Sequence, residues 1–483
     1  MADLSYFHGV KLEESPDTPS LVRINRFGTT FANGSAPDAD PAQFPLGLTL
    51  VTSLTQAAAL GTAGTLLDMV TTLFGEGATY VIVNRVEHSA DATTMQNNLV
   101  GDPVARTGLY AALTAKSRGL PQPRVLITAG NTGAWIEGGL VSVSVATNGE
   151  KLTEAPVVTF TGGGTDAGKV LPTAVAVLGT GVNAGKVVSI TVTSAGKNMT
   201  AAPTVGFTGG GSDAGKVLPT AIANIGDVGN PFVSAAKVIC PQIRARAYFN
   251  GPNTTNAAAV RWRSTLGDRI LPIDPMGIKL VDDVPVVVPS AAVFAGVRAR
   301  VVASSEGVSG SVSNKPIRTL DGVARTIQYP ADSNYLNENS VNTIIRRTDL
   351  VTWGSRLAAS DVLWQFDSVR ATADMVNEAL EDVYFQWVDK KFTAANLKMA
   401  VEDGNNAMRV FVLNNDILTG SVFLTVNNTP SLNAQGKVFF GVRFEPVGLM
   451  EQIHITTYRD PLVAYELLFD QVQGLIQEGP LAA

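Results

Sequence analysis

Apolar and polar residues alternate over the first 130 positions in a way that predicts strands and helices in turn. Apolar runs with the length of buried strands occur at 46–53, 78–86 and 123–130. Between them, residues 54–76 and 107–119 have helical composition, and Gly61 and Gly64 interrupt the first helix. Alternating strands and helices are typical of a layered α/β fold with a central sheet.

The same mixture resumes after residue 230. Residues 230–250 contain an apolar-rich helix that Pro241 breaks or kinks, and residues 341–357 alternate strand-like and turn-like positions. Long helices are predicted at about 367–389 and 393–414. The first places these apolar residues near one face: Val369, Ala373, Val376 and Leu380. Strands are then predicted at 421–427, 437–446 and 451–458, followed by an amphipathic, Leu-rich stretch at 462–476.

The chain begins with a detached strand. Residues 5–13 place four side chains on one side of an extended segment: Tyr6, His8, Val10 and Leu12. Residues 13–20, "EESPDTPS", contain two prolines and form a stiff tether. Because a lone strand is not stable without a sheet to join, this segment must pair elsewhere in the chain or in another copy.

Residues 131–230 differ from the rest of the chain. They hold 19 of the 46 glycines, and no arginine occurs between Arg124 and Arg244. The segment contains a repeat with a spacing of 47 residues: 13 of the 14 residues at 161–174 are identical at 208–221. Apolar residues in each copy alternate with small polar ones, which predicts two small all-β modules.

The repeated sequence "TGGGTDAGKV" has the glycine and lysine spacing of a phosphate-binding P-loop. A P-loop requires Ser or Thr after the lysine to hold Mg²⁺, but Val170 and Val217 occupy those positions. We therefore interpret both copies as connections between strands. Within them, Asp166 and Asp213 are either turn residues or weak cation ligands, and the turn role is favoured.

Composition narrows the possible functions. Charged residues make up 16% of the 483 residues, against about a quarter in ordinary soluble proteins, which suggests surfaces buried against other chains. The net charge of −6 gives no basic footprint for nucleic acid. The single cysteine, Cys240, excludes an intramolecular disulfide. Neither a membrane span nor a conventional signal peptide is predicted.

No catalytic, cofactor-binding or metal-binding site is predicted, and the chain is not expected to be an enzyme. The three histidines, His8, His88 and His454, have no other ligand type at metal-binding spacing. His8 and His454 are predicted to be ordinary strand residues. Arg346 and Arg347 either pair with acidic groups of a neighbouring chain or form a solvated charge pair.

Two regions resemble the tail-sheath proteins of contractile-tailed bacteriophages, in particular the sheath type of P2-like myophages. Near the N-terminus the resemblance rests on "FHGVKLEE", "FPLGLTLVTSL" and "VIVNRVEH". Near the C-terminus it rests on "LNENSVNTIIRRTDLVTWGSRLAASD" and on the long helix "FDSVRATADMVNEALEDVYFQWVDK". It covers roughly 1–130 and 231–475 and stops at the repeat segment, which P2-like sheath proteins lack.

The resemblance implies a multidomain α/β (α+β) fold with a mixed-sheet core and extended terminal arms, into which the repeat segment is inserted as an all-β domain. The expected divisions are an N-terminal arm at 1–22, a sheath domain at 23–130 and 231–335, the insert at 131–230, a C-terminal core domain at 336–460 and a C-terminal arm at 461–483.

The resemblance also implies a structural role. Subunits would stack as six-fold rings in a helical cylinder around a tail tube, contact baseplate and tail terminator proteins, and contract to drive the tube through a host envelope. They would assemble in the bacterial cytoplasm and end up in the virion, without a cofactor, nucleic acid or membrane insertion. The candidate interface residues are Tyr6, His8, Val10, Leu12, Arg346, Arg347, Ile453, Ile455, Leu462 and Leu467.

Three alternatives remain at this point. One is the sheath of a related contractile device, such as a tailocin or a secretion system. The second, motivated by the repeats, is a surface adhesin or carbohydrate-binding β protein. The third is an NTPase.

Overall fold

The computed structural model describes residues 27–477. The chain forms two compact units, Met1–Val447 and Gly448–Ala483. Of the predicted interface residues, four lie outside the described residues: Tyr6, His8, Val10 and Leu12.

The first unit is built on a central sheet of six strands, in the order β12-β11-β4-β1-β3-β2. Five strands run parallel, and the edge strand β2 is antiparallel to β3. The strands are β1 (Thr30–Ser35), β2 (Gly47–Val51), β3 (Val81–Val86), β4 (Val125–Thr128), β11 (Arg246–Asn250) and β12 (Ile270–Ile273). All residues of β1, β4, β11 and β12 are buried, as expected where helices cover both faces. The predicted α/β layer is confirmed.

Two groups of helices cover this sheet. Helices α2 (Leu66–Glu76) and α6 (Ser290–Ala303) pack together and contact β1, while α4 (Pro231–Gln242) packs on the 3₁₀ helix η2 (Gly108–Thr114) and contacts β11. The shorter helices are α1 (Leu54–Ala57), η1 (Ala58–Leu60), α3 (Ala92–Val100), η3 (Lys116–Arg118) and α5 (Asn256–Arg263).

The predicted break in the first helix is confirmed, because Gly61 and Gly64 lie between η1 and α2. The single helix predicted at 107–119 is wrong, because this segment forms the two 3₁₀ helices η2 and η3. No side chain caps its start, and Gly108 has a φ of +54°, which lies outside the α-helical region.

Two small sheets are formed by strands that follow the central sheet along the chain. One joins β13 (Gly277–Val281), β14 (Val284–Val288) and β16 (Gly322–Val323), and the other joins β15 (Lys315–Pro316), β18 (Leu350–Trp353) and β17 (Thr343–Arg346). Helix α7 (Ala331–Glu338) precedes β17. The strand and turn pattern predicted at 341–357 is therefore the β17–β18 hairpin.

Residues 135–229 form a separate antiparallel sheet with the order β5-β10-β9-β6-β7-β8. Its strands are β5 (Trp135–Thr147), β6 (Val157–Gly162), β7 (Thr173–Leu178), β8 (Val187–Ser194), β9 (Pro203–Thr208) and β10 (Thr220–Gly229), with η4 (Gly181–Asn183) before β8. The insert is all-β, as the sequence predicts, but its two repeats share one sheet instead of forming one module each. The first strand of each repeat pairs with the last strand of the other repeat, β5 with β10 and β8 with β7.

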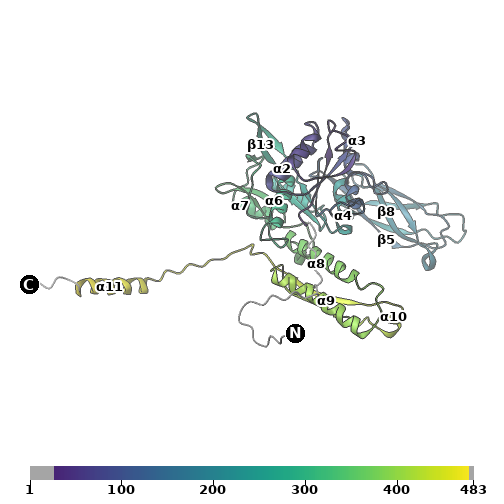
Figure 1. Cartoon of the computed structure of the whole chain (residues 1–483). Coiled ribbons are helices and arrows are strands. Elements are labelled where there is room, and N and C mark those ends of the chain that lie inside the picture. The colour runs from purple at the N-terminus through teal and green to yellow at the C-terminus, as the bar shows by residue number, and fades with distance from the viewer. Residues whose placement is uncertain (1–26, 478–483) are drawn as a thin grey trace, which may run out of the picture. The chain divides into compact units, whose positions relative to one another are not determined.

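The last layer of the first unit contains two long helices and a hairpin. Helices α8 (Asp367–Phe385) and α9 (Ala394–Leu413) pack side by side (Figure 1), and α9 packs on β19. Strand β19 (Ile417–Leu424) pairs with β20 (Phe440–Pro446) in a two-stranded sheet. The remaining elements are η5 (Val362–Trp364) and α10 (Pro430–Ala434). Both predicted helices and the strands predicted at 421–427 and 437–446 are confirmed.

The described residues of the second unit, 448–477, contain one helix, α11 (Pro461–Gln477), where the sequence predicts an amphipathic stretch. The strand predicted at 451–458 is wrong for the isolated chain, because residues 451–458 have no regular structure. Ile453 and Ile455 are 73% and 81% exposed. The alternating pattern is present, but residues 451–458 pair with no strand among the described residues, and an unpaired strand is not stable.

Among residues 27–477, no helix is long and apolar enough to cross a membrane. The same residues contain no group of three or more His, Cys, Asp or Glu that could hold a metal ion.

Cys240 lies in the last turn of α4, next to Pro241, and is fully buried. Burial raises the pKa of its thiol to about 12, from an ordinary value of 9.0. A rise of three pKa units leaves about a thousandfold less thiolate at pH 8. We expect the native chain to react with a thiol-specific disulfide reagent at least that much more slowly than the urea-unfolded chain. Equal rates would show that α4 opens readily.

Candidate functional site

Helix α8 carries a row of carboxylates on one side. Asp367, Asp374, Glu378 and Glu381 follow one another at spacings of seven, four and three residues, which places them on a common side of a helix. The opposite side is apolar and packs against α9 and β19, with Met375, Leu380 and Phe411 in the shared core. Helix α8 therefore has two buried faces of different chemistry.

Arginines from the central sheet and its helices pair with this row of carboxylates. We call the carboxylates and their arginine partners the ionic stripe. Arg246 of β11 donates from Nε to Asp367 Oδ1 at 2.7 Å, and Arg298 Nε of α6 lies 3.5 Å from Asp367 Oδ2. These three side chains are at most 1% exposed. Arg124, just before β4, pairs with Glu378, and these two side chains are 2% and 10% exposed.

Two further pairs extend the ionic stripe towards the surface. Arg269 donates to both carboxylate oxygens of Asp374, at 2.7 and 2.9 Å. Arg244 donates from Nη1 to Glu381 Oε2 at 2.8 Å, and the Glu381 side chain is 63% exposed. The stripe thus runs from a fully buried end at Asp367 to a solvent-exposed end at Glu381.

At the buried end of the ionic stripe, burial and the neighbouring charges shift the pKa values of the arginines. Burial lowers the pKa of Arg298 and of Arg124, and the neighbouring carboxylates offset this only in part. Burial is the largest influence on the pKa of Arg246 and acts to lower it, but the charges of Asp367 and Asp374, the neighbouring Tyr248 and the hydrogen bond to Asp367 together outweigh it, and the net pKa is raised. Asp367 thus serves two guanidinium groups and is closer to Arg246. Removing one partner here would leave an uncompensated buried charge.

The ionic stripe was missed in the sequence, although its signal is present. The apolar face of the helix at 367–389 was recognised, but the carboxylates on the opposite side were not connected with arginines that lie up to 254 residues away. Acidic residues at helical spacing are usually solvent-exposed, so the pattern alone does not indicate a buried interface.

The hairpin β19–β20 is a second feature with functional potential. Each of its strands pairs only with the other among the described residues. The Asn405 side chain bonds the backbone N–H and C=O of Val422 on β19, so the outer edge of β20 is the more open one. Leu418 and Leu424 of β19 are exposed. Such edges accept additional strands from other chains.

The predicted interface residues in the described part of the chain do not form one cluster. They are far apart in the sequence and belong to both units. Arg346 ends β17 and donates to the Asp321 backbone oxygen at 3.2 Å. Arg346 and Arg347 have no ion-pair partner among the described residues, so their role stays a prediction. Ile453, Ile455, Leu462 and Leu467 belong to the second unit, and their side chains are exposed.

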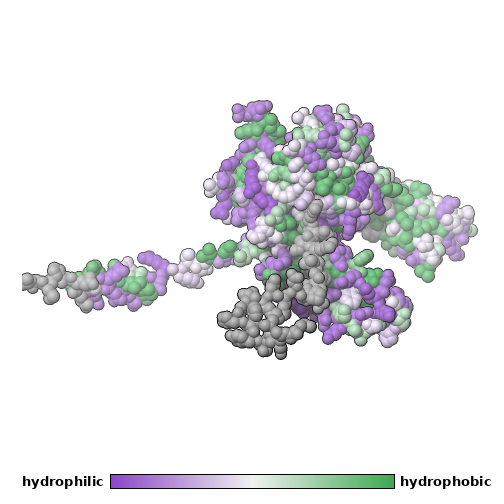
Figure 2. Space-filling model, in the orientation of Figure 1, coloured by the Kyte–Doolittle hydropathy of each residue, from purple (hydrophilic) through white to green (hydrophobic). Residues whose placement is uncertain are grey.

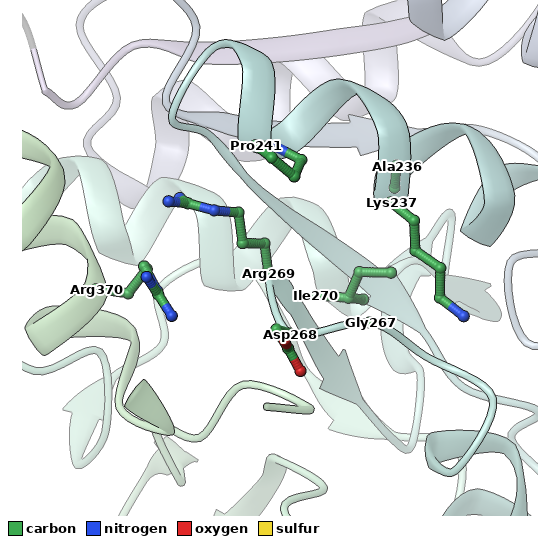
Figure 3. Close-up of a pocket in the computed structure, with 8 residues that line it drawn as sticks. All are labelled: Ala236, Lys237, Pro241, Gly267, Asp268, Arg269, Ile270 and Arg370. Atoms are coloured by element: carbon green, nitrogen blue, oxygen red, sulfur yellow. The ribbon is translucent and has the colours of Figure 1, made fainter. Parts of the chain in front are cut away.

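A cavity of about 340 Å³ is lined by residues of α4, the approach to β12, and α8 (Figure 3). Its polar groups have partners within the protein. Lys237 donates to the Thr265 backbone oxygen at 2.8 Å, and Arg269 pairs with Asp374. Arg370 stacks on Trp364, with its guanidinium carbon 4.2 Å from the ring centroid. These groups stabilise the fold, and their arrangement does not suggest a reaction.

The glycine loops of the insert also use their charged residues locally. Lys169 donates to the Gly164 backbone oxygen, and Lys216 donates to that of Gly211. Asp166 Oδ1 accepts from the Gly168 N–H at 2.7 Å, and Asp213 Oδ1 accepts from the Gly215 N–H at 2.8 Å. The turn role predicted for Asp166 and Asp213 is confirmed.

Glycine is required at one position of each loop. A Cβ at Gly164 would lie 1.9 Å from Thr200 Oγ1, and one at Gly211 would lie 1.7 Å from Thr153 Oγ1. Both glycines also have a φ near +90°, which side chains disfavour. Each loop packs closely against another part of the same chain, and this packing explains the glycines without a phosphate ligand.

No protein-family model matches the chain. Among curated proteins, a prophage major tail sheath protein of Pseudomonas aeruginosa (strain UCBPP-PA14) is 30% identical over 219 residues, 43% of this chain and 56% of that protein. The tail sheath protein of Escherichia phage P2 is 24% identical over 226 residues, 44% of this chain and 57% of that protein. The alignments thus span about half the length of these relatives.

Solved structures resemble nearly the whole chain. The contracted sheath complex of an extracellular contractile injection system (PVC) has a TM-score of 0.57 at 14% identity and covers 95% of this chain and 99% of its own. The contracted helical sheath of the anti-feeding prophage has a TM-score of 0.56 at 14% identity and covers 94% and 100%. The chain is therefore related in sequence to phage tail sheath proteins and has the fold of contractile sheath subunits.

Proposed function

We propose that this chain is the subunit of a contractile sheath, which polymerises as six-fold rings in a helical cylinder around an inner tube and contracts to drive that tube through a cell envelope. The observation that carries the proposal is the open β19–β20 hairpin in a chain whose C-terminal unit exposes large apolar side chains. Both features lack partners within the described chain and acquire them in a polymer. The likeness to sheath assemblies over 94–95% of the chain supports the same role.

In this proposal the terminal segments connect neighbouring subunits. Residues 451–458 keep the alternating pattern of a strand, and they would add to the hairpin edge of a neighbour by β-augmentation. Main-chain hydrogen bonds would supply the attachment, and alternate side chains such as Ile453 and Ile455 would fix the register. The N-terminal residues Tyr6, His8, Val10 and Leu12 would act in the same way, so that linked subunits can rotate without separating.

The ionic stripe would make each subunit a stiff lever. It ties α8 to the central sheet, while the other side of α8 holds the hairpin that receives the arms. A change of lattice at the hairpin would then rotate the whole central sheet. Contraction requires only a small free-energy difference per subunit between two packings, summed over many copies and without nucleotide hydrolysis.

The proposed partners are other copies of this chain, a tube protein, and baseplate and terminator proteins, with assembly in a bacterial cytoplasm and use in a virion. An injection device outside phages is the second candidate, because the solved neighbours include the sheath of an extracellular contractile injection system.

The all-β insert would project from the cylinder as decoration. Its strands expose valine and isoleucine, including Val157, Val175 and Ile222, and Figure 2 shows the corresponding hydrophobic surface. Such a surface suits packing between neighbouring subunits or adhesion to a host surface.

Electron microscopy of the purified full-length chain tests the function. Long hollow cylinders are expected, because subunits joined head to tail by exchanged strands form open helical polymers. A chain that stays monomeric at every concentration and ionic strength would refute the proposal.

A further inference from the structure

The C-terminal end of α8, the start of α9 and the start of β20 enclose an apolar groove next to the hairpin. Its volume is about 600 Å³, and four aromatic side chains line it: Tyr384, Trp387, Phe392 and Phe440. The Tyr384 and Phe440 rings lie 4.7 Å apart, and Trp387 donates from Nε1 to Asp403 at 3.0 Å. These contacts hold the aromatic walls in place, so the groove is preformed.

The rim of the groove carries two lysines and one carboxylate, Asp389, and is basic on balance. Lys390 and Lys391 belong to its lining and are exposed. Neither has an ion-pair partner among the described residues, whereas Lys398 of α9, outside the groove, lies 3.7 Å from Glu402. An apolar groove with two unpaired lysines at its rim favours an apolar ligand with carboxylates beside its buried surface.

Helix α11 has that chemistry. Its exposed apolar residues include Leu462, Phe469 and Leu475, and residues 461–477 contain no lysine or arginine. Its only charged residues, Glu466 and Asp470, are four positions apart and therefore lie on one side of the helix. Leu462 and Phe469 lie four positions before and three positions after Glu466, so the carboxylates border apolar side chains.

We propose that α11 of one copy binds in this groove of a second copy, with its apolar side chains among the aromatic walls and with Glu466 and Asp470 facing Lys390 and Lys391. This inference rests on the proposed sheath function, because it needs neighbouring subunits. Residues 448–460 can span roughly 45 Å when extended, which is enough for α11 to extend beyond its own subunit. A neighbour's residues 451–458 paired with β20 would also bring α11 close to the groove, because α11 begins three residues later.

Cross-linking between full-length chains tests this contact. One chain carries Asn396→Cys, which lies in the groove lining, and the other carries Gln473→Cys, seven positions after Glu466 and therefore on the same side of α11. After mixing under assembly conditions, a short bismaleimide is expected to give covalent dimers only in the mixture. The buried Cys240 is the internal control for unreactive thiols.

Charge reversal then tests the ion pairs. Lys390→Glu with Lys391→Glu in the groove chain should lower the dimer yield about tenfold, and Glu466→Lys with Asp470→Lys in the other chain should restore it. The matched control Lys398→Glu should leave it unchanged. Cylinders without dimers would overturn the docking proposal and leave the sheath function standing. Dimers without cylinders would support docking and contradict the sheath function, and the absence of both would overturn both.

Discussion

Replacing Asp367 with alanine is expected to lower the free energy of unfolding by about 3–5 kcal/mol. The carboxylate is fully buried, accepts from Arg246 at 2.7 Å and lies 3.5 Å from Arg298. Its loss would leave two buried guanidinium groups without their counter-charge, and water could not replace it. Urea denaturation of the unassembled chain, followed by tryptophan fluorescence, measures the change.

Glu381→Ala provides a matched control on the same helix. It removes the exposed end of the ionic stripe, where the side chain of Arg244 is 31% exposed, and surface ion pairs contribute less than about 1 kcal/mol. Equal effects of the two substitutions would show that α8 is held by its apolar face alone, and the lever role proposed for the stripe would lose its basis.

The sequence predicted most of the elements because their patterns are local. The strands β3 and β4 lie in apolar runs, and the long helices show a regular apolar face. The strands β1, β11 and β12 were not predicted, and the sequences of β1 (TFANGS) and β11 (RAYFN) are not continuous apolar runs. The turn between β13 and β14 was not identified, although Asp282 and Asp283 both adopt a positive φ and Asp is among the residues that tolerate it. Its flanking valines alone did not distinguish a hairpin from one longer strand.

Non-local features could not be predicted in the same way. The ionic stripe depends on which strands lie next to α8, and no periodicity within one helix specifies that. The strand predicted at 451–458 illustrates the opposite case: its pattern is correct for a strand, but the pattern does not supply a partner edge. A polymer-forming chain can therefore encode structure that the isolated chain does not show.

The repeat shows how internal symmetry changes an interpretation. Val157 pairs with Thr208 and Thr161 pairs with Thr204, and each of these residues lies 47 positions from its equivalent in the other repeat. The β6–β9 pair is therefore the centre of a two-fold relation between the repeats. Exchange of the first strands, β5 and β8, follows from this symmetry, and repeat spacing alone does not distinguish it from two separate modules.

Both ends of the insert meet at Asn230. Its side-chain amide donates to the backbone oxygens of Asn131, Thr132 and Ala134, at 3.1, 2.9 and 2.9 Å. Its Oδ1 accepts from the Val233 N–H at 3.1 Å and caps α4. One residue thus fixes the entry of the insert, its exit and the start of a core helix.

Asn230→Ala is therefore expected to lower the free energy of unfolding by about 3 kcal/mol, from roughly 1 kcal/mol for the helix cap and about 2 kcal/mol for the buried hydrogen bonds. Asn224→Ala is the matched control, because Asn224 donates to Ser142 and Ser144 on the exposed surface of the insert, where water replaces the lost bonds. Its effect should stay below about 0.5 kcal/mol. Thermal and urea unfolding of both variants measure the difference. A small effect of Asn230→Ala would contradict this role of the junction and would mean that the insert is attached through its sheet. The insert would then be expected to unfold together with the central sheet instead of separately.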